Sequence, residues 1–107
     1  MEIFQISKTF PKEETYSLTD QIRRSSRAVV TNIAEAYRKR QYPAFFSSKS
    51  SDADMENTET KAWMDFARAC IYIDDRAWTH LESKTDEVGR LLGDMIDNPE
   101  KYCRKTK

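Results

Sequence analysis

QIRRSSRAVVTNIAEAYRKR, residues 21–40, is the stretch that decides the fold of this chain. On a helical wheel of about 100° per residue, the apolar side chains here and just upstream fall within about 60° of Ile22. They are Leu18, Val29, Ile33, Ala36 and Tyr37. This spacing predicts an amphipathic helix that begins near Ser17 or Thr19, either of which is a suitable N-cap, and ends near Arg40.

The opposite face of this helix is basic. Its cations, with the two that follow at the helix end, are Arg23, Arg24, Arg27, Arg38, Lys39 and Arg40. A flank of small or hydrogen-bonding residues separates the apolar side from the basic face. This flank consists of Gln21, Ser25, Ala28, Asn32 and Glu35. Because small residues let another helix approach closely, we expect the helix to pack on two sides.

A longer helix is predicted after Pro43, a favoured first-turn residue, and it includes the serine-rich stretch 47–51. The reason is that one helical face persists over seven turns, which a loop has no cause to maintain. The expected core face consists of Phe45, Phe46, Ala53, Thr60, Trp63, Ala67, Cys70 and Ile71. Asp52, Glu56 and Glu59 fall on the same face of the wheel.

Those three carboxylates need partners, because an ionised group that is buried without one is costly. If the two helices form an antiparallel hairpin across residues 41–43, Asp52 lies level with Asn32, Glu56 with Val29, and Glu59 with Ser25. We therefore expect a polar network between helices or between subunits. Its members are Gln21, Ser25, Asn32, Glu35, Asp52, Glu56 and Glu59.

The two ends of the chain complete the predicted architecture. MEIFQISKTF, residues 1–10, has helical spacing but is short, and residues 74–97 form a last helix that Asn98 and Pro99 stop. The connections are short, which favours antiparallel neighbours. We predict one domain over residues 1–107: an all-α, antiparallel up-and-down four-helix bundle with a short or truncated first helix and a basic tail at 98–107.

The net charge of zero conceals a segregation of charge along the chain. Residues 18–40 hold six cations and two acids, whereas residues 50–66 hold one cation and five acids. Residues 74–97 hold three cations and seven acids, and the tail is again basic. Only 38 % of the 107 residues are apolar, so helices this long are expected to rely on partner subunits as well as on their own core.

The sequence offers little for catalysis. Cys70 and Cys103 stand apart, and the lone His80 has no carboxylate three residues before it, as a bundle di-metal site would require. No glycine-rich oxyanion loop accompanies a nucleophile. We expect no enzymatic activity and no cofactor or metal. No stretch approaches the about 18 apolar residues of a membrane span and no signal peptide opens the chain, so a cytoplasmic protein is expected.

The basic face of residues 21–40 leaves two interpretations open. In the first, Arg23, Arg24, Arg27, Arg38, Lys39 and Arg40 are solvated or pair with acidic helices of a neighbouring subunit. In the second, they contact nucleic acid, and the basic tail, with Lys101, Arg104, Lys105 and Lys107, extends that surface. Neutral overall charge argues against a dedicated nucleic-acid binder.

Several segments together resemble the 23S rRNA-intervening-sequence proteins, also called S23-type four-helix bundle proteins. The segments are FPKEET, LTDQIRRSSRAVVTNIAEAY, SDADMENTETKAWMDFA and NPEKY, which lie between residues 9 and 102. The resemblance implies an up-and-down bundle, no enzymatic activity and, in some members, a pentameric ring. Most members have a longer first helix. A relative in fold is the accessory protein of diversity-generating retroelements, which binds a reverse transcriptase and nucleic acid.

From these observations we expect a homo-oligomer, a pentamer by the resemblance, that acts as a ring-forming adaptor or scaffold. The alternative is an RNA- or DNA-binding protein that uses the arginine face of residues 21–40. A nucleic acid or a nucleic-acid enzyme is a further possible partner under either hypothesis. A membrane is not.

Overall fold

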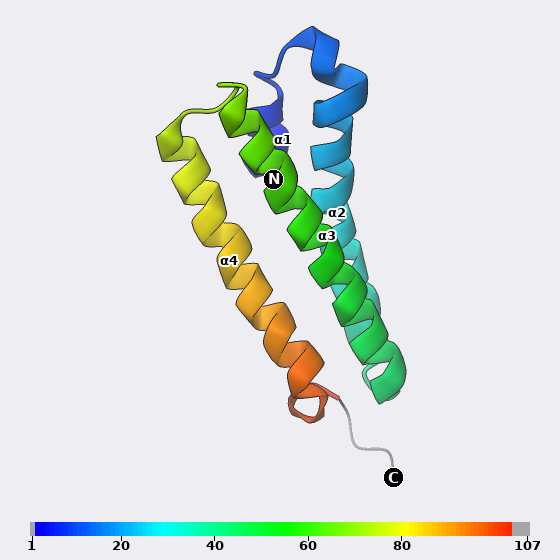
Figure 1. Ribbon diagram of the computed structural model, residues 1–107. Helices are drawn as coiled ribbons and strands as arrows, with labels where there is room; N and C mark the ends of the chain where they lie inside the picture. The colour runs from blue at the N-terminus through cyan, green and yellow to red at the C-terminus, as the bar shows by residue number, and fades with distance from the viewer. Residues whose placement is uncertain (1, 104–107) are drawn as a thin grey trace.

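The chain folds as an elongated all-α bundle in a computed structural model that describes residues 2–103 (Figure 1). It measures 54 × 24 × 17 Å along its principal axes. The described residues contain four α-helices and no strand. The helices are α1 (Glu2–Ser7), α2 (Asp20–Arg38), α3 (Pro43–Ala69) and α4 (Asp75–Asp97). The predicted antiparallel four-helix bundle is confirmed, including its short first helix.

The helix α3 is the centre of the fold, because it packs against α2 on one side and α4 on the other. The short helix α1 packs on α2 and lies behind α3 in the view of Figure 1. The serine-rich stretch 47–51 lies inside α3, as the helical period predicts. Ser50 is fully buried there, and its hydroxyl donates to the Phe46 carbonyl at 2.8 Å.

The start of α2 differs from the expected capped end. A 3₁₀ turn at Lys12–Glu14 and a π-helical turn at Thr15–Thr19 run directly into α2. The Thr19 side chain makes no capping hydrogen bond, and the Ser17 hydroxyl donates to the Glu14 carboxylate instead. Because α2 continues directly from these turns, its first backbone amides do not form a separate helix end that a capping side chain would satisfy.

Two core clusters occupy opposite ends of the bundle. The first joins α1 to the other helices through Ile22, Met64, Ile73 and Leu81, with Ile3 and Ile6 of α1 packed against it. The second lies towards the chain's C-terminal end. Its fully buried members are Ala36, Phe46, Ala53, Leu92 and Met95. The short α1 covers only the first cluster, so the middle of the bundle is less well covered than its ends.

The buried face of α3 differs in part from the expected one. It consists of Phe46, Ser50, Ala53, Asn57, Thr60, Met64 and Ala67. Three residues that were expected in the core are exposed. Phe45 is 38 % exposed and Ile71 is 86 % exposed, and Cys70 is also exposed. Cys70 and Ile71 are exposed because α3 ends at Ala69, and the polar residues Ser50 and Asn57 take core positions that the wheel prediction did not include.

The end of α3 is closed by a Schellman motif with an unusual residue in it. The Tyr72 amide donates to the Ala67 carbonyl at 2.9 Å, and the Ile71 amide donates to the Arg68 carbonyl at 3.0 Å. This geometry places Ile71 at φ 62°, a left-handed conformation that glycine adopts readily and a β-branched residue does not. The fold therefore carries local backbone strain at this turn.

Replacing Ile71 with glycine should relieve that strain. The side chain is 86 % exposed, so little packing is lost. We expect a gain of about 1 kcal/mol in the free energy of unfolding and a rise of about 4–8 °C in Tm, measured by thermal circular dichroism. Cys70→Gly is the matched control, since Cys70 has φ −83° and should lose stability instead. Equal effects of the two replacements would contradict the assignment of strain to Ile71.

Candidate interaction site

The interface between α2 and α3 contains a buried hydroxyl pair. Thr60 donates through Oγ1 to the Ser25 Oγ at 2.8 Å, and both residues are nearly inaccessible to solvent. Further along the hairpin, the Lys49 ammonium lies 2.9 Å from the Glu35 carboxylate. Both contacts fit the register expected from the 41–43 connection. The sequence analysis did not single out Lys49 as a partner, although its place three residues before Asp52 on the hairpin was a usable signal.

The predicted polar network is divided into separate local contacts. The Lys49 ammonium lies 2.9 Å from the Glu35 carboxylate and 3.9 Å from the Asp52 carboxylate, and the hydrogen bond that it donates to Glu35 raises the pKa of Lys49. The Gln21 side-chain oxygen accepts from Arg24 at 3.1 Å. The Asn32 amide bonds within its own helix, to the Ala28 carbonyl at 2.9 Å. Among the network residues named here, only Ser25 contacts a side chain, that of Thr60, which is buried between α2 and α3.

The carboxylates of α3 lie at the edge of its packed face and not within it, which corrects the wheel prediction. Asp52 and Glu59 are exposed, and Glu56 is half-buried. One oxygen of Glu56, Oε2, is buried without a hydrogen-bond partner among the described residues. Burial raises the pKa of Glu56, the nearby charge of Glu59 raises it further, and Arg24 opposes both. This site therefore favours an additional positive charge.

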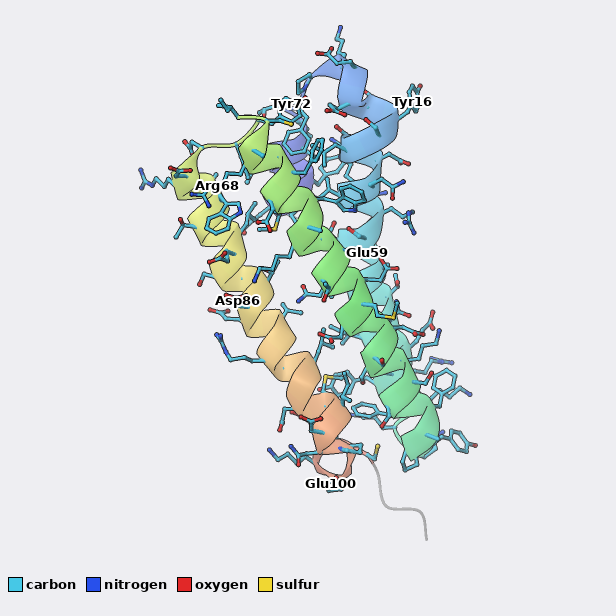
Figure 2. The ribbon with its side chains drawn as sticks, viewed as in Figure 1. Tyr16, Glu59, Arg68, Tyr72, Asp86 and Glu100 are labelled. Carbon is cyan, nitrogen blue, oxygen red and sulfur yellow. The ribbon has the colours of Figure 1, made fainter. Side chains whose placement is uncertain are left out.

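Beside these carboxylates, α3 has an apolar outward face. We define it by Met55, Glu59, Ala62 and Phe66, which follow one another at the i, i+4, i+7, i+11 spacing of a single helical row. Met55 is 65 % exposed and Phe66 is 47 % exposed. Figure 2 shows Glu59 on the side of α3 turned away from α4. Met55 and Phe66 are the two large apolar side chains that this row exposes.

The six predicted surface cations form no single patch. Arg23 and Arg27 lie over the Phe4 ring of α1, with their guanidinium carbons 4.4 Å and 5.9 Å from the ring centroid. Lys39 and Arg40 lie beside tyrosine rings at the far end of α2. At 1.5 Å per residue, the two ends are roughly 25 Å apart. In the part of the chain that the structure covers, Arg24, Arg27 and Arg38 are exposed and form no ion pair.

The predicted basic tail is described only to Cys103, so Arg104, Lys105 and Lys107 lie outside the described residues. Lys101 forms an ion pair within the fold, because its ammonium lies 3.0 Å from the Asp94 carboxylate. Hydrogen bonds from Tyr102, Lys101 and Asn98 lower the pKa of Asp94 to about 2. The hydrogen bond that the Tyr102 hydroxyl donates to Asp94 also raises the pKa of Tyr102, to about 12. These bonds hold the end of α4 against the second core cluster.

Within residues 2–103, no group of three or more histidine, cysteine or carboxylate residues is arranged to hold a metal ion. His80 instead lies 3.1 Å from the Glu2 carboxylate, a hydrogen bond that lowers the pKa of Glu2. None of the helices in this range is both long enough and apolar enough to cross a bilayer. The fold of the described residues defines the chain as an all-α helical-bundle protein.

The comparisons with known proteins place the chain in a family. The family model of the 23S rRNA-intervening sequence protein matches residues 1–94, and the chain belongs to this family. A crystal structure from Bacteroides thetaiotaomicron, described as a protein of unknown function from the S23 ribosomal protein family, is similar in fold. Its TM-score is 0.80 and its sequence identity 27 %, and the match covers 88 % of this chain and 87 % of that one. No curated protein sequence matches the chain.

Proposed function

We propose that this protein is a non-enzymatic scaffold that assembles with copies of itself into a closed ring. The observation that carries the proposal is the outward face of α3, where Met55 and Phe66 are exposed next to Glu56 and Glu59. Neither carboxylate forms an ion pair within residues 2–103. A neighbouring subunit would bury the apolar side chains and bring cations to the carboxylates.

The complementary surface is available on the same chain. Arg24, Arg27 and Arg38 are exposed along α2 and form no ion pair within the described residues. An acidic, apolar face of one copy fits a basic face of the next better than it fits itself. Contacts between two different faces are heterologous, and they generate rings when the rotation closes. This asymmetry favours a cyclic assembly over a two-fold dimer, and the pentamer is the proposed ring size.

The double replacement Met55→Glu with Phe66→Glu should abolish the assembly. Both side chains are already exposed in the single chain, so the bundle should still fold. Two charges at apolar contact positions should weaken subunit association by about a hundredfold or more. Light scattering coupled to size-exclusion chromatography, at micromolar protein, should give a multimer for the unmodified chain and a 12.6 kDa monomer for the variant.

The control for this experiment is Tyr16→Glu. Tyr16 is 94 % exposed but precedes α2 and lies off the outward face of α3. Its replacement should leave the multimer intact. A monomeric unmodified chain at micromolar concentration would overturn the proposal, and so would equal dissociation by the Tyr16 variant.

A second candidate function is binding of RNA or DNA through the same unpaired arginines of α2. It is favoured by the exposure of Arg24, Arg27 and Arg38. Phosphate contacts would make the affinity fall steeply with salt, by roughly one unit of log–log slope for each cation engaged. Titration of a generic duplex at several salt concentrations separates the candidates. Tight, salt-sensitive binding by the monomeric variant would favour this second function.

A further inference from the structure

The turn between α2 and α3 combines positive charge with exposed aromatic rings. Residues 36–51, which run across this turn, hold four cations and no acid, the longest acid-free stretch of the chain. Tyr42 is 55 % exposed and Phe45 is 38 % exposed. Figure 1 shows the turn at the same end of the bundle as the last turn of α4. We define the hairpin corner by Lys39, Arg40, Tyr42 and Phe45.

The two cations of the hairpin corner are not used in ion pairs. Neither Lys39 nor Arg40 forms one within residues 2–103. The Lys39 ammonium lies 5.8 Å from the centroid of the Tyr42 ring, and the Arg40 guanidinium carbon lies 5.1 Å from that of Tyr37. The Arg40 Nε is buried without a hydrogen-bond partner among the described residues. An anion from outside the chain would therefore meet two cations that no carboxylate has paired.

The start of α3 adds to the positive charge of the corner. The side chain of its N-cap residue, Tyr42, makes no capping hydrogen bond, and Pro43 supplies no amide hydrogen. The first amides of a helix have no intrahelical partner, and the helix dipole places partial positive charge there. Two exposed acids at this end of the bundle, Asp97 and Glu100, belong to α4 and to the 3₁₀ turn after it. The positive charge is therefore concentrated on the hairpin side of this end.

An anionic bilayer attracts this combination of groups. Exposed aromatic rings settle at the level of the headgroups, and each lysine or arginine near an anionic bilayer strengthens binding by about fivefold. We propose that the hairpin corner docks on the surface of an anionic bilayer, with Tyr42 and Phe45 among the headgroups and Lys39 and Arg40 at the lipid phosphates. A bilayer partner was not expected from the sequence, since no segment is apolar enough to span one, but docking on a surface needs no span.

The symmetry of a ring favours a flat partner for this site. In the closed ring proposed above, equivalent points of all subunits lie in one plane, so a bilayer can contact every corner at once. Several weak contacts made together raise the overall affinity without any new contact. This step rests on the proposed ring, whereas the docking of a single corner does not. The corner includes neither Met55 and Phe66 of the outward face of α3 nor the arginines assigned to the assembly.

Co-sedimentation with lipid vesicles tests the proposal. One set of vesicles contains phosphatidylglycerol and phosphatidylcholine in equal parts, and the other contains phosphatidylcholine alone. The full chain should bind the anionic vesicles at least about tenfold more tightly, and added salt should weaken this binding. Lys39→Glu and Tyr42→Ser should each weaken it by about fivefold or more. Both side chains are exposed, so circular dichroism should show both variants folded.

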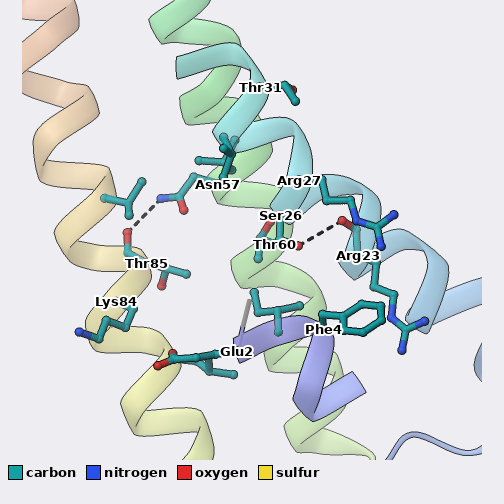
Figure 3. A pocket seen from close by; sticks show the side chains of 15 residues that line it. Glu2, Phe4, Arg23, Ser26, Arg27, Thr31, Asn57, Thr60, Lys84 and Thr85 are labelled. Carbon is teal, nitrogen blue, oxygen red and sulfur yellow. Dashed lines mark hydrogen bonds between the residues drawn. The ribbon is translucent and has the colours of Figure 1, made fainter. Parts of the chain in front are cut away.

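The matched controls make the same replacements elsewhere on the chain. Lys84→Glu changes an exposed lysine of α4 beside the cavity between α2 and α4 (Figure 3). Tyr16→Ser changes a tyrosine that is 94 % exposed and precedes α2. Both should leave vesicle binding unchanged. Equal binding to the two kinds of vesicle would overturn the proposal, and so would equal losses from Lys39→Glu and Lys84→Glu. A single-stranded oligonucleotide that displaces the vesicles and depends on Lys39 would assign the corner to nucleic acid, which also overturns it.

Docking and assembly are separated by repeating Lys39→Glu in the Met55→Glu, Phe66→Glu background. In a ring every corner changes at once, so the replacement should weaken vesicle binding by a larger factor in the multimer than in the monomeric variant. If the unmodified chain is itself a monomer, the ring proposal fails, and docking then predicts the single-corner loss of about fivefold. A monomer that bound both kinds of vesicle equally would overturn the docking as well.

Discussion

Replacement of Phe46 with alanine is expected to cost about 3–5 kcal/mol of the free energy of unfolding. Phe46 is fully buried near the start of α3 and stacks on Tyr102 with ring centroids 5.8 Å apart. Its ring also meets Tyr37 of α2 edge-on at 6.2 Å, so one side chain joins three parts of the chain. A chain of this length has about 5–15 kcal/mol in total, so the variant should be close to unfolding.

Urea denaturation followed by circular dichroism measures this loss directly. Phe45→Ala is a closely matched control, because it removes the same atoms one residue earlier in α3. Phe45 is 38 % exposed, and the Lys49 ammonium lies over its ring, 6.0 Å from the centroid. Its replacement should cost about 1 kcal/mol or less. Similar losses in the two variants would show that the second core cluster does not depend on Phe46 in the way the packing indicates.

The contrast between these neighbouring phenylalanines also shows what the sequence could predict. Helical period predicted α2, α3 and α4, and the short connections predicted their antiparallel order and the register of the α2–α3 hairpin. It did not predict which edge of α3 faces inward. A wheel weights residues by polarity, but Ser50 and Asn57 are buried because their hydrogen bonds are satisfied, by the Phe46 carbonyl of the same helix and by the Thr85 carbonyl of α4. The burial of Asn57 depends on a tertiary partner that no single-helix pattern contains.

The candidate site was predictable to a similar degree. Segregation of charge between α2 and α3 is a property of the sequence, and it indicated the basic surface of α2 that the proposed assembly uses. The outward face of α3 was not found, since Met55 and Phe66 had been left unassigned while Asp52, Glu56 and Glu59 were placed inside.

Replacement of Arg23 with alanine should detach α1 from the bundle. The Arg23 Nε donates to the Ser7 hydroxyl at 2.7 Å, and the guanidinium lies over the Phe4 ring. Ser7 is 2 % exposed, so its hydroxyl would lose its charged partner in a site with little access to water. A charge-assisted hydrogen bond and a cation–π contact together predict a loss of about 2–4 kcal/mol.

The loss should be concentrated in α1, because a six-residue helix has little stability of its own. Amide hydrogen exchange should accelerate at Gln5–Thr9 well before it does in α3. Arg24→Ala is the matched control, since Arg24 is exposed and bonds only to Gln21 one turn away, and it should cost about 0.5 kcal/mol or less. Arg23→Lys should fall between the two, because an ammonium keeps the charge but cannot stack on Phe4 as a planar guanidinium does. If Arg23→Ala and Arg24→Ala left α1 equally protected, Arg23 would be a surface cation, available to a partner, and not the residue that holds α1 in place.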